Sequence, residues 1–212
     1  TLQIFSTVFS IGLSSSLFRF YFEDDSEEYR RKIVGTTLWL MLISSAALSV
    51  VGLLFSGTLS RVILGTARYR WYFTLMFATM ALTLLLRLPY LVLRAQKRSK
   101  QYAVFNVLQF CTQLILIIWL VVGLGQGIWG VILGRFVTVG VFAVASFFYV
   151  RKELSLEFSS GDARELFKFG YPLVYVGLAG MVLNYFDQYF INIFMGLADV
   201  GVYNLGYKIG MV

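Results

Sequence analysis

Long apolar runs separated by short polar stretches dominate this sequence of 212 residues. The runs are continuous rather than alternating, as in residues 38–54 and 114–124. Strands of a membrane barrel would alternate polar and apolar side chains, and buried helices of soluble proteins usually stop short of the roughly 20 apolar residues that a bilayer requires. The pattern therefore predicts about six or seven transmembrane helices. Six are expected at residues 1–22, 33–55, 71–93, 102–123, 128–150 and 169–195. A seventh begins after a tight turn at residues 196–199.

The composition supports a membrane protein. Hydrophobic residues make up 58% of the chain and charged residues 14%, and the mean hydropathy is +0.76. Soluble domains are about 45–50% apolar and about 25% charged, so a soluble fold of this size has no way to bury so much apolar surface. We expect an all-α fold, a polytopic transmembrane helix bundle with the lipid bilayer as its main partner.

Several kinds of chemistry are excluded or disfavoured. The chain has one cysteine, Cys111, and no histidine, so an internal disulfide, a zinc site of Cys and His ligands and a histidine base are all excluded. The acidic run at residues 23–28 lies beside basic residues 30–32 and indicates a solvated loop rather than a metal site. We expect no catalytic residues, no metal and no bound cofactor. The net charge of +7 is better explained by cytoplasmic loops than by binding to nucleic acid.

The basic residues predict the orientation in the membrane. The loops at residues 23–32, 94–101 and 151–168 carry eleven Lys and Arg, whereas the three alternate loops carry three, all within residues 56–70. Because basic loops stay in the cytoplasm, the loops at residues 23–32, 94–101 and 151–168 are expected there and Thr1 on the outer side.

The longest polar stretch, residues 151–168, predicts a cytoplasmic linker between two bundles. Residues 1–150 are then a first transmembrane lobe and residues 169–212 the start of a second. Within the linker, residues 159–167 are typical of a helix start, with Ser160 as its cap and Asp162 and Glu165 in its first turn. Both ends of the sequence fall in apolar stretches, so we expect a piece of a longer chain.

Three expected spans carry a stripe of polar or small residues on one helical face. One interpretation is a shared water-filled cavity, and the other is hydrogen bonding and close packing between helices. The three stripes together favour the cavity. They consist of Thr79, Thr83 and Arg87; of Tyr102, Asn106, Gln109 and Gln113; and of Gly177, Gly180, Asn184, Asp187, Gln188 and Asn192.

Charged residues inside the spans sharpen the cavity interpretation. Asp187 and Lys208 lie at matching depths on adjacent helices, roughly 13–15 Å from the turn that joins them, so we hypothesise that they face one cavity and pair. Arg19 either faces the same cavity or extends to the cytoplasmic surface. Pro172 is expected to kink its helix.

Three segments carry a family resemblance. They are FSIGLSSSLFRFYFEDD (residues 9–25), LRAQKRSKQYAVFNVLQ (residues 93–109) and ELFKFGYPLVYVGLAGMVLNYFDQYFINIFMGLADVGVYNLGYKIG (residues 165–210). In this order they resemble polysaccharide biosynthesis membrane proteins, the oligosaccharide flippases of the multidrug/oligosaccharidyl-lipid/polysaccharide exporter superfamily.

The resemblance implies a two-lobed exporter fold in the plasma membrane of a prokaryote. It implies a transporter, not an enzyme, that moves lipid-linked oligosaccharides carrying a pyrophosphate to the outer leaflet by alternating access. Proton or sodium coupling and contacts with other polysaccharide-assembly membrane proteins are also implied. The alternatives are a multidrug or cation antiporter of the same superfamily and a membrane-embedded glycan-processing enzyme. The cavity candidates are Arg19, Asn106, Gln109, Gln113, Asn184, Asp187, Gln188, Asn204 and Lys208.

Overall fold

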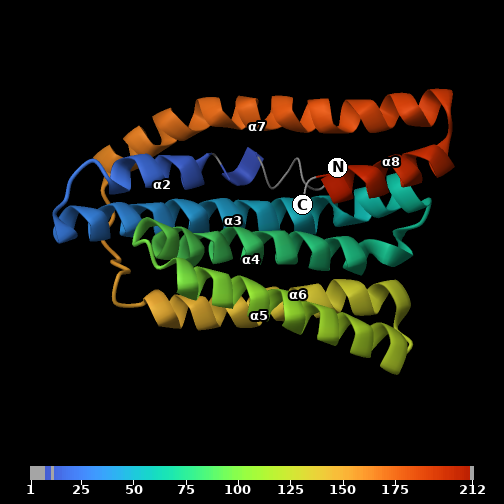
Figure 1. Ribbon diagram of the computed structural model, residues 1–212, viewed down its shortest axis with the longest axis horizontal. Helices are drawn as coiled ribbons and strands as arrows, with labels where there is room; N and C mark the ends of the chain where they lie inside the picture. Colours follow the sequence, from blue (N-terminus) through green and yellow to red (C-terminus); the bar gives the residue numbers. More distant parts are fainter. Residues whose placement is uncertain (1–7, 11, 211–212) are drawn as a thin grey trace.

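The computed structural model describes residues 8–10 and 12–210, except for the side chains of Ala67, Asn184, Leu197, Ala198, Leu205 and residues 207–210. All regular structure in this part of the chain is helical (Figure 1). The helices are α2 (Leu13–Tyr21), α3 (Glu27–Leu64), α4 (Arg70–Ala95), α5 (Ser99–Ile118), α6 (Gly127–Val150), α7 (Ser160–Phe194) and α8 (Leu197–Gly210). A 3₁₀ turn, Ala67–Tyr69, precedes α4, and a π-helical turn, Trp119–Gly123, extends α5.

Five of these helices are long and apolar enough to cross a membrane: α3, α4, α5 with its π-helical turn, α6 and α7. The predicted all-α polytopic bundle is therefore confirmed. The other two expected spans correspond in the described residues to shorter helices, since α2 has 9 residues and α8 has 14.

The three basic loops lie at one end of the bundle, on the left in Figure 1. They are the α2–α3, α4–α5 and α6–α7 connections, and the connections with few or no basic residues lie at the opposite end. By the positive-inside rule the basic end is the cytoplasmic end, and it is so named below.

Two helices extend well beyond the predicted spans. The span expected at residues 33–55 belongs to α3, whose 38 residues continue to Leu64, where Gly65 adopts a left-handed conformation and ends the helix. The span expected to begin at residue 169 belongs to α7, which begins at Ser160 and continues through Pro172. Hydropathy reports where a helix contacts lipid, whereas the helix itself ends only where its backbone hydrogen bonding stops.

The first predicted span is interrupted at Gly12. This residue has a φ of 62° and immediately precedes α2, so residues 1–22 do not form one unbroken helix. Residues 1–7 and Ile11 lie outside the described residues.

The α6–α7 connection is tied to α3. Trp39 donates from Nε1 to the carbonyl oxygen of Leu156 at 3.0 Å, and the Ser159 amide donates to Oγ1 of Thr36 at 3.3 Å. The Ser159 side chain in turn accepts a hydrogen bond from the amide of Asp162 and caps α7. The prediction that Ser160 is the cap is therefore wrong by one residue.

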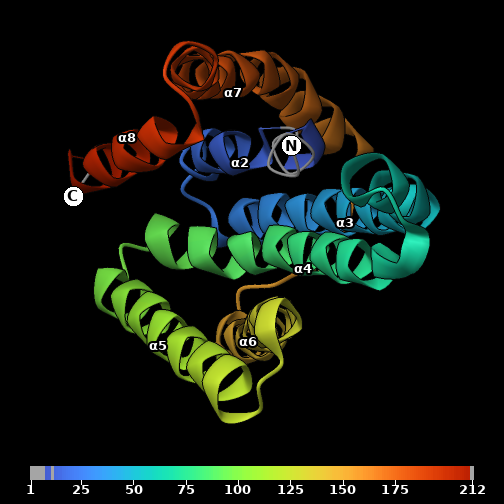
Figure 2. The same ribbon diagram turned by 90° about the vertical axis from the view of Figure 1, so that its right-hand side faces the viewer.

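The largest hydrophobic cluster lies toward the cytoplasmic end. It joins α2, α3 and α4 to the last residue of α6 and the first turns of α7, and its fully buried members include Leu13, Leu17, Leu93, Val150 and Leu166. In contrast, α5 has no buried residue and lies apart from α7, on the other side of α3 and α4 (Figure 2).

Candidate functional site

A close seam joins α2 to the first third of α7. Ser16 donates from Oγ to the carbonyl oxygen of Leu166 at 3.0 Å, and both residues are fully buried. At Gly12 the backbones approach so closely that an added Cβ would overlap the carbonyl oxygen of Gly170 and lie 2.9 Å from its Cα. The seam therefore depends on two glycines and one small polar residue, as close helix packing in membranes generally does.

Arg19 lies at the cytoplasmic end of this seam. Its guanidinium carbon is 4.5 Å from the centre of the Phe169 ring on α7, within the range of a cation–π interaction. The side chain is exposed rather than enclosed. The structure thus places Arg19 where α2 and α7 meet, which is compatible with either of its two interpretations.

Beyond the seam, α7 exposes both polar and apolar side chains. Its described side chains include no buried residue after Val174. Asp187 is exposed and accepts a hydrogen bond from the hydroxyl of Tyr203 on α8 at 3.1 Å. Gln188 and Asn204 are half-buried on the same two helices. This outer part of α7 and α8 is the candidate site that the described residues assemble.

Two residues predicted for this region lie outside the described side chains. They are Asn184 on α7 and Lys208 on α8. The pairing of Asp187 with Lys208 therefore stays a prediction, and the partner that the structure gives to Asp187 is Tyr203.

The polar stripe of α5 faces α4. The hydroxyl of Tyr90 on α4 donates to Oε1 of Gln109 at 2.7 Å. Asn106 donates to the carbonyl oxygen of Tyr102 in its own helix at 2.8 Å, and Gln113 is half-buried nearby. Gln109 thus makes the interhelical hydrogen bond that the second interpretation of the stripes expects.

The stripes of α5 and α7 do not come together. In α4, Thr79 and Thr83 each donate to a carbonyl of the preceding turn at 2.7 Å. Figure 2 shows α5 and α7 on opposite sides of α3 and α4, so the stripes of α5 and α7 do not line one cavity in this structure. Helical periodicity places the residues of a stripe on one face of their helix, but it does not show which helix that face contacts.

Replacing Tyr90 with phenylalanine tests the role of the α5 stripe. Loss of this interhelical hydrogen bond is expected to lower the free energy of unfolding by about 0.5–2 kcal/mol. Unfolding of the full-length protein in detergent measures the effect, and Tyr149→Phe, at an exposed position on α6, serves as the control. Unchanged stability would mean that this hydrogen bond does not hold α4 and α5 together and would favour the cavity interpretation of the α5 stripe.

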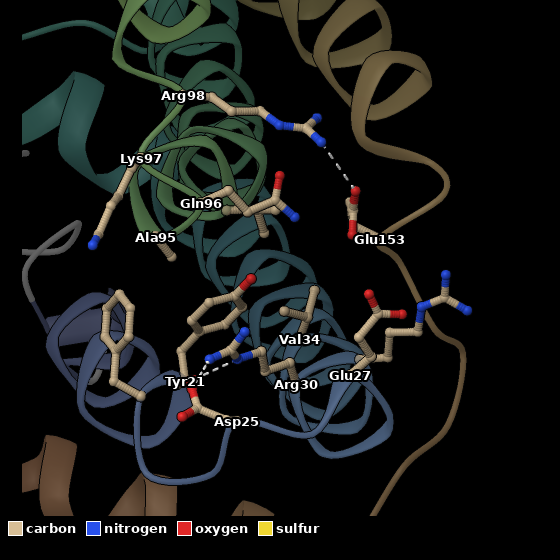
Figure 3. A pocket seen from close by; sticks show the side chains of 13 residues that line it. Tyr21, Asp25, Glu27, Arg30, Val34, Ala95, Gln96, Lys97, Arg98 and Glu153 are labelled. Atoms are coloured by element: carbon tan, nitrogen blue, oxygen red, sulfur yellow. Dashed lines mark hydrogen bonds and ion pairs between the residues drawn. The ribbon is translucent and has the colours of Figure 1, made fainter.

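A hollow at the cytoplasmic end gathers charged residues that the sequence showed only as loop charges (Figure 3). It has a volume of about 520 Å³ and lies between the α2–α3, α4–α5 and α6–α7 connections. Its charged lining consists of Asp25, Glu27, Arg30, Arg31, Lys97, Arg98 and Glu153. The signals in the sequence were the charged runs at residues 23–32 and 94–100, but nothing in the sequence showed that they meet, because the residues come from three separated segments.

The described residues form an all-α bundle with five helices suited to crossing a bilayer, and this architecture defines a multi-pass membrane protein. The model of the polysaccharide biosynthesis protein family matches residues 1–212, and the chain belongs to that family. No curated protein and no solved structure matches the chain.

Proposed function

We propose that this chain is part of a transporter that flips lipid-linked oligosaccharide or polysaccharide intermediates from the cytoplasmic to the outer leaflet by alternating access. Membership of the polysaccharide biosynthesis family and the multi-pass helical architecture support a role in moving a glycan across a membrane. The proposal places the protein in the plasma membrane of a prokaryote and assigns it no catalytic step.

The main observation behind the proposal is that the packing of α7 changes along its length. At the cytoplasmic end, α7 is closely packed against α2 through Gly12, Ser16 and Leu166. Farther along, the same helix presents Asp187 and Gln188 on an accessible polar face. Close packing at the cytoplasmic end of α7 and exposure of its side chains farther along would fit one of the two states that alternating access requires.

The charges inside the spans favour an anionic substrate over the cationic one of a multidrug or cation antiporter. Before the last helix, Asp187 is the single acidic residue of the predicted spans, whereas Arg19, Arg87 and Arg135 are basic; the last helix adds Lys208 and, in its first turn, Asp199. The pyrophosphate of a lipid-linked glycan is attracted by such an excess of positive charge. Proton or sodium coupling through Asp187 and contacts with other polysaccharide-assembly proteins are part of the proposal.

Deleting the gene tests this function. We expect the lipid-linked glycan to accumulate on the cytoplasmic leaflet while its synthesis continues, because the carrier lipid is loaded but not moved. Access of a membrane-impermeant glycan-binding reagent to the outer leaflet measures the distribution, and cells complemented with the intact gene are the control. Loss of glycan synthesis itself would favour the membrane-embedded enzyme, and an unchanged glycan distribution with altered drug resistance would favour the antiporter.

A further inference from the structure

We propose that the cytoplasmic hollow is a binding site for a phosphate-bearing headgroup, held chiefly by Arg98 and Arg30. Its volume of about 520 Å³ lies within the range of about 300–1,000 Å³ typical of small-molecule sites. The site lies at the end of the bundle where the basic loops gather, which is the level of the cytoplasmic headgroups. Basic pockets between transmembrane helices on this side are suited to phosphorylated lipid headgroups.

The two arginines have only weakly held acidic partners. Arg98 pairs with Glu153 at 3.6 Å, and both side chains are partly exposed. Arg30 pairs with Asp25, whose side chain is fully exposed. Solvent-exposed ion pairs contribute about 0–1 kcal/mol, whereas a phosphate bonded to an arginine fork makes shorter and stronger hydrogen bonds. A phosphate therefore competes well with these carboxylates.

The polar groups between the arginines also suit such a ligand. Figure 3 shows Gln96 and the hydroxyl end of Tyr21 in the hollow, between Arg98 on one side and Arg30 on the other. The Oε1 atom of Gln96 is buried and has no hydrogen-bond partner among the described residues. A buried acceptor without a partner is rare in native proteins, and a hydroxyl of a headgroup would satisfy it. Val34 and Val92 add apolar lining.

The backbone at Lys97 gives a second, independent indication of function. Lys97 follows α4 with a φ of 58°, and it is the single described residue other than glycine with positive φ. The Lys97 amide donates to the carbonyl of Arg94 and the Arg98 amide to that of Leu93, which is the helix-ending motif that strongly favours glycine at this position. A lysine is unfavourable for the backbone here, and such strained positions cluster at functional sites; Lys97 is one of the residues that line the hollow, with its side chain directed away from Arg98 (Figure 3).

Two sources of the phosphate fit this chemistry. One is an anionic phospholipid of the cytoplasmic leaflet, which would anchor or regulate the bundle. The other is the diphosphate of the lipid-linked glycan, bound before it is transported. Only this second source rests on the proposed function.

Binding to the purified full-length protein in a neutral detergent tests the proposal. The two probes are inorganic diphosphate and phosphatidylglycerol, with phosphatidylcholine, a zwitterionic lipid of zero net charge, as the reference, and titration calorimetry gives the Kd of each. We expect Arg98→Gln to weaken binding about tenfold, since it removes one charge-assisted hydrogen bond. Lys100→Gln, an exposed cation in the next turn that does not line the hollow, is the matched control and should leave the Kd unchanged.

Two further variants separate binding from a structural role. Glu153→Gln should strengthen phosphate binding because it frees Arg98. If the Arg98–Glu153 ion pair had only a structural role, Arg98→Gln and Glu153→Gln would lower the stability of the protein equally. Lys97→Gly should raise the thermal unfolding temperature, because glycine tolerates positive φ, and should weaken binding at the same time.

The outcomes decide both the site and its ligand. Preference for phosphatidylglycerol would assign the site to membrane lipid, and preference for diphosphate would assign it to the substrate. Binding of neither probe, an unchanged Kd for Arg98→Gln, or an equal loss for Lys100→Gln would overturn the proposal. Because binding is measured without flipping, intact binding in a protein that does not flip would contradict the proposed function alone.

Discussion

Replacing Gly12 with alanine is expected to destabilise the protein by about 3 kcal/mol and to abolish the proposed glycan flipping. Two effects add at this position. The φ of 62° is unfavourable for any residue with a Cβ, and the new methyl group would overlap the Gly170 carbonyl oxygen across the α2–α7 seam. The atoms nearest to the new methyl group are backbone atoms of Gly170, and a backbone has no flexible end that can move aside. The hydrogen bond from Ser16 to Leu166 would be lost with the seam.

Gly65→Ala is the matched control for this experiment. Gly65 has a similar φ of 70°, but a Cβ there would meet no atom within 4 Å. Its replacement should therefore cost about 1–2 kcal/mol from backbone strain alone. Unfolding of the full-length protein in detergent, together with glycan flipping in cells, measures both variants. Equal losses of stability for the two variants would mean that the close contact between α2 and α7 adds nothing.

Replacing Gly52 with alanine is expected to destabilise the α3–α4 packing by about 2–3 kcal/mol. A Cβ at Gly52 would overlap the Cβ of Phe77 and lie 2.5 Å from its Cγ. Phe77 is 1% exposed and packs with Leu48 and Ala81, so its ring has little space to move into. The two helices would have to separate, and in a bilayer such contacts depend on close packing rather than on hydrophobic transfer.

The control for this variant is Gly57→Ala, one and a half turns farther along α3. No atom lies within 4 Å of a Cβ added there. Because alanine favours a helix over glycine by about 1 kcal/mol, this variant should be neutral or slightly stabilising. If Gly52→Ala and Gly57→Ala unfold alike, the close approach of α3 to Phe77 is not important for stability.

The hydropathy pattern was most accurate where a span is bounded by polar turns at both ends. The spans expected at residues 71–93 and 128–150 differ by no more than about two residues from α4 and α6. It failed where a helix continues beyond its apolar run, as in the last turns of α3 and the first turns of α7. It also missed the interruption at Gly12, because a single glycine changes the backbone without changing the hydropathy.

The candidate site was predicted less completely than the fold. Asp187 and Gln188 do lie on an accessible face of α7, but the described partner of Asp187 is Tyr203, which the sequence did not single out. Gln109 bonds to Tyr90 on α4 rather than contributing to a cavity shared with α7. The cytoplasmic hollow was not predicted, since its residues come from three connections and the adjoining helix ends, which are far apart in sequence.

By itself, the sequence determined the membrane class, the approximate spans and the end of the bundle that carries the basic loops. These properties follow from the free energy of transferring side chains between water and lipid. That free energy depends on the composition of each segment and not on the segments that pack against it. Only the tertiary structure decided which polar faces meet, where Gly12 and Gly170 touch, and how Arg30, Gln96 and Arg98 come to line one hollow. Helical periodicity fixes the direction of a side chain about its own axis, whereas its partner depends on how distant helices pack.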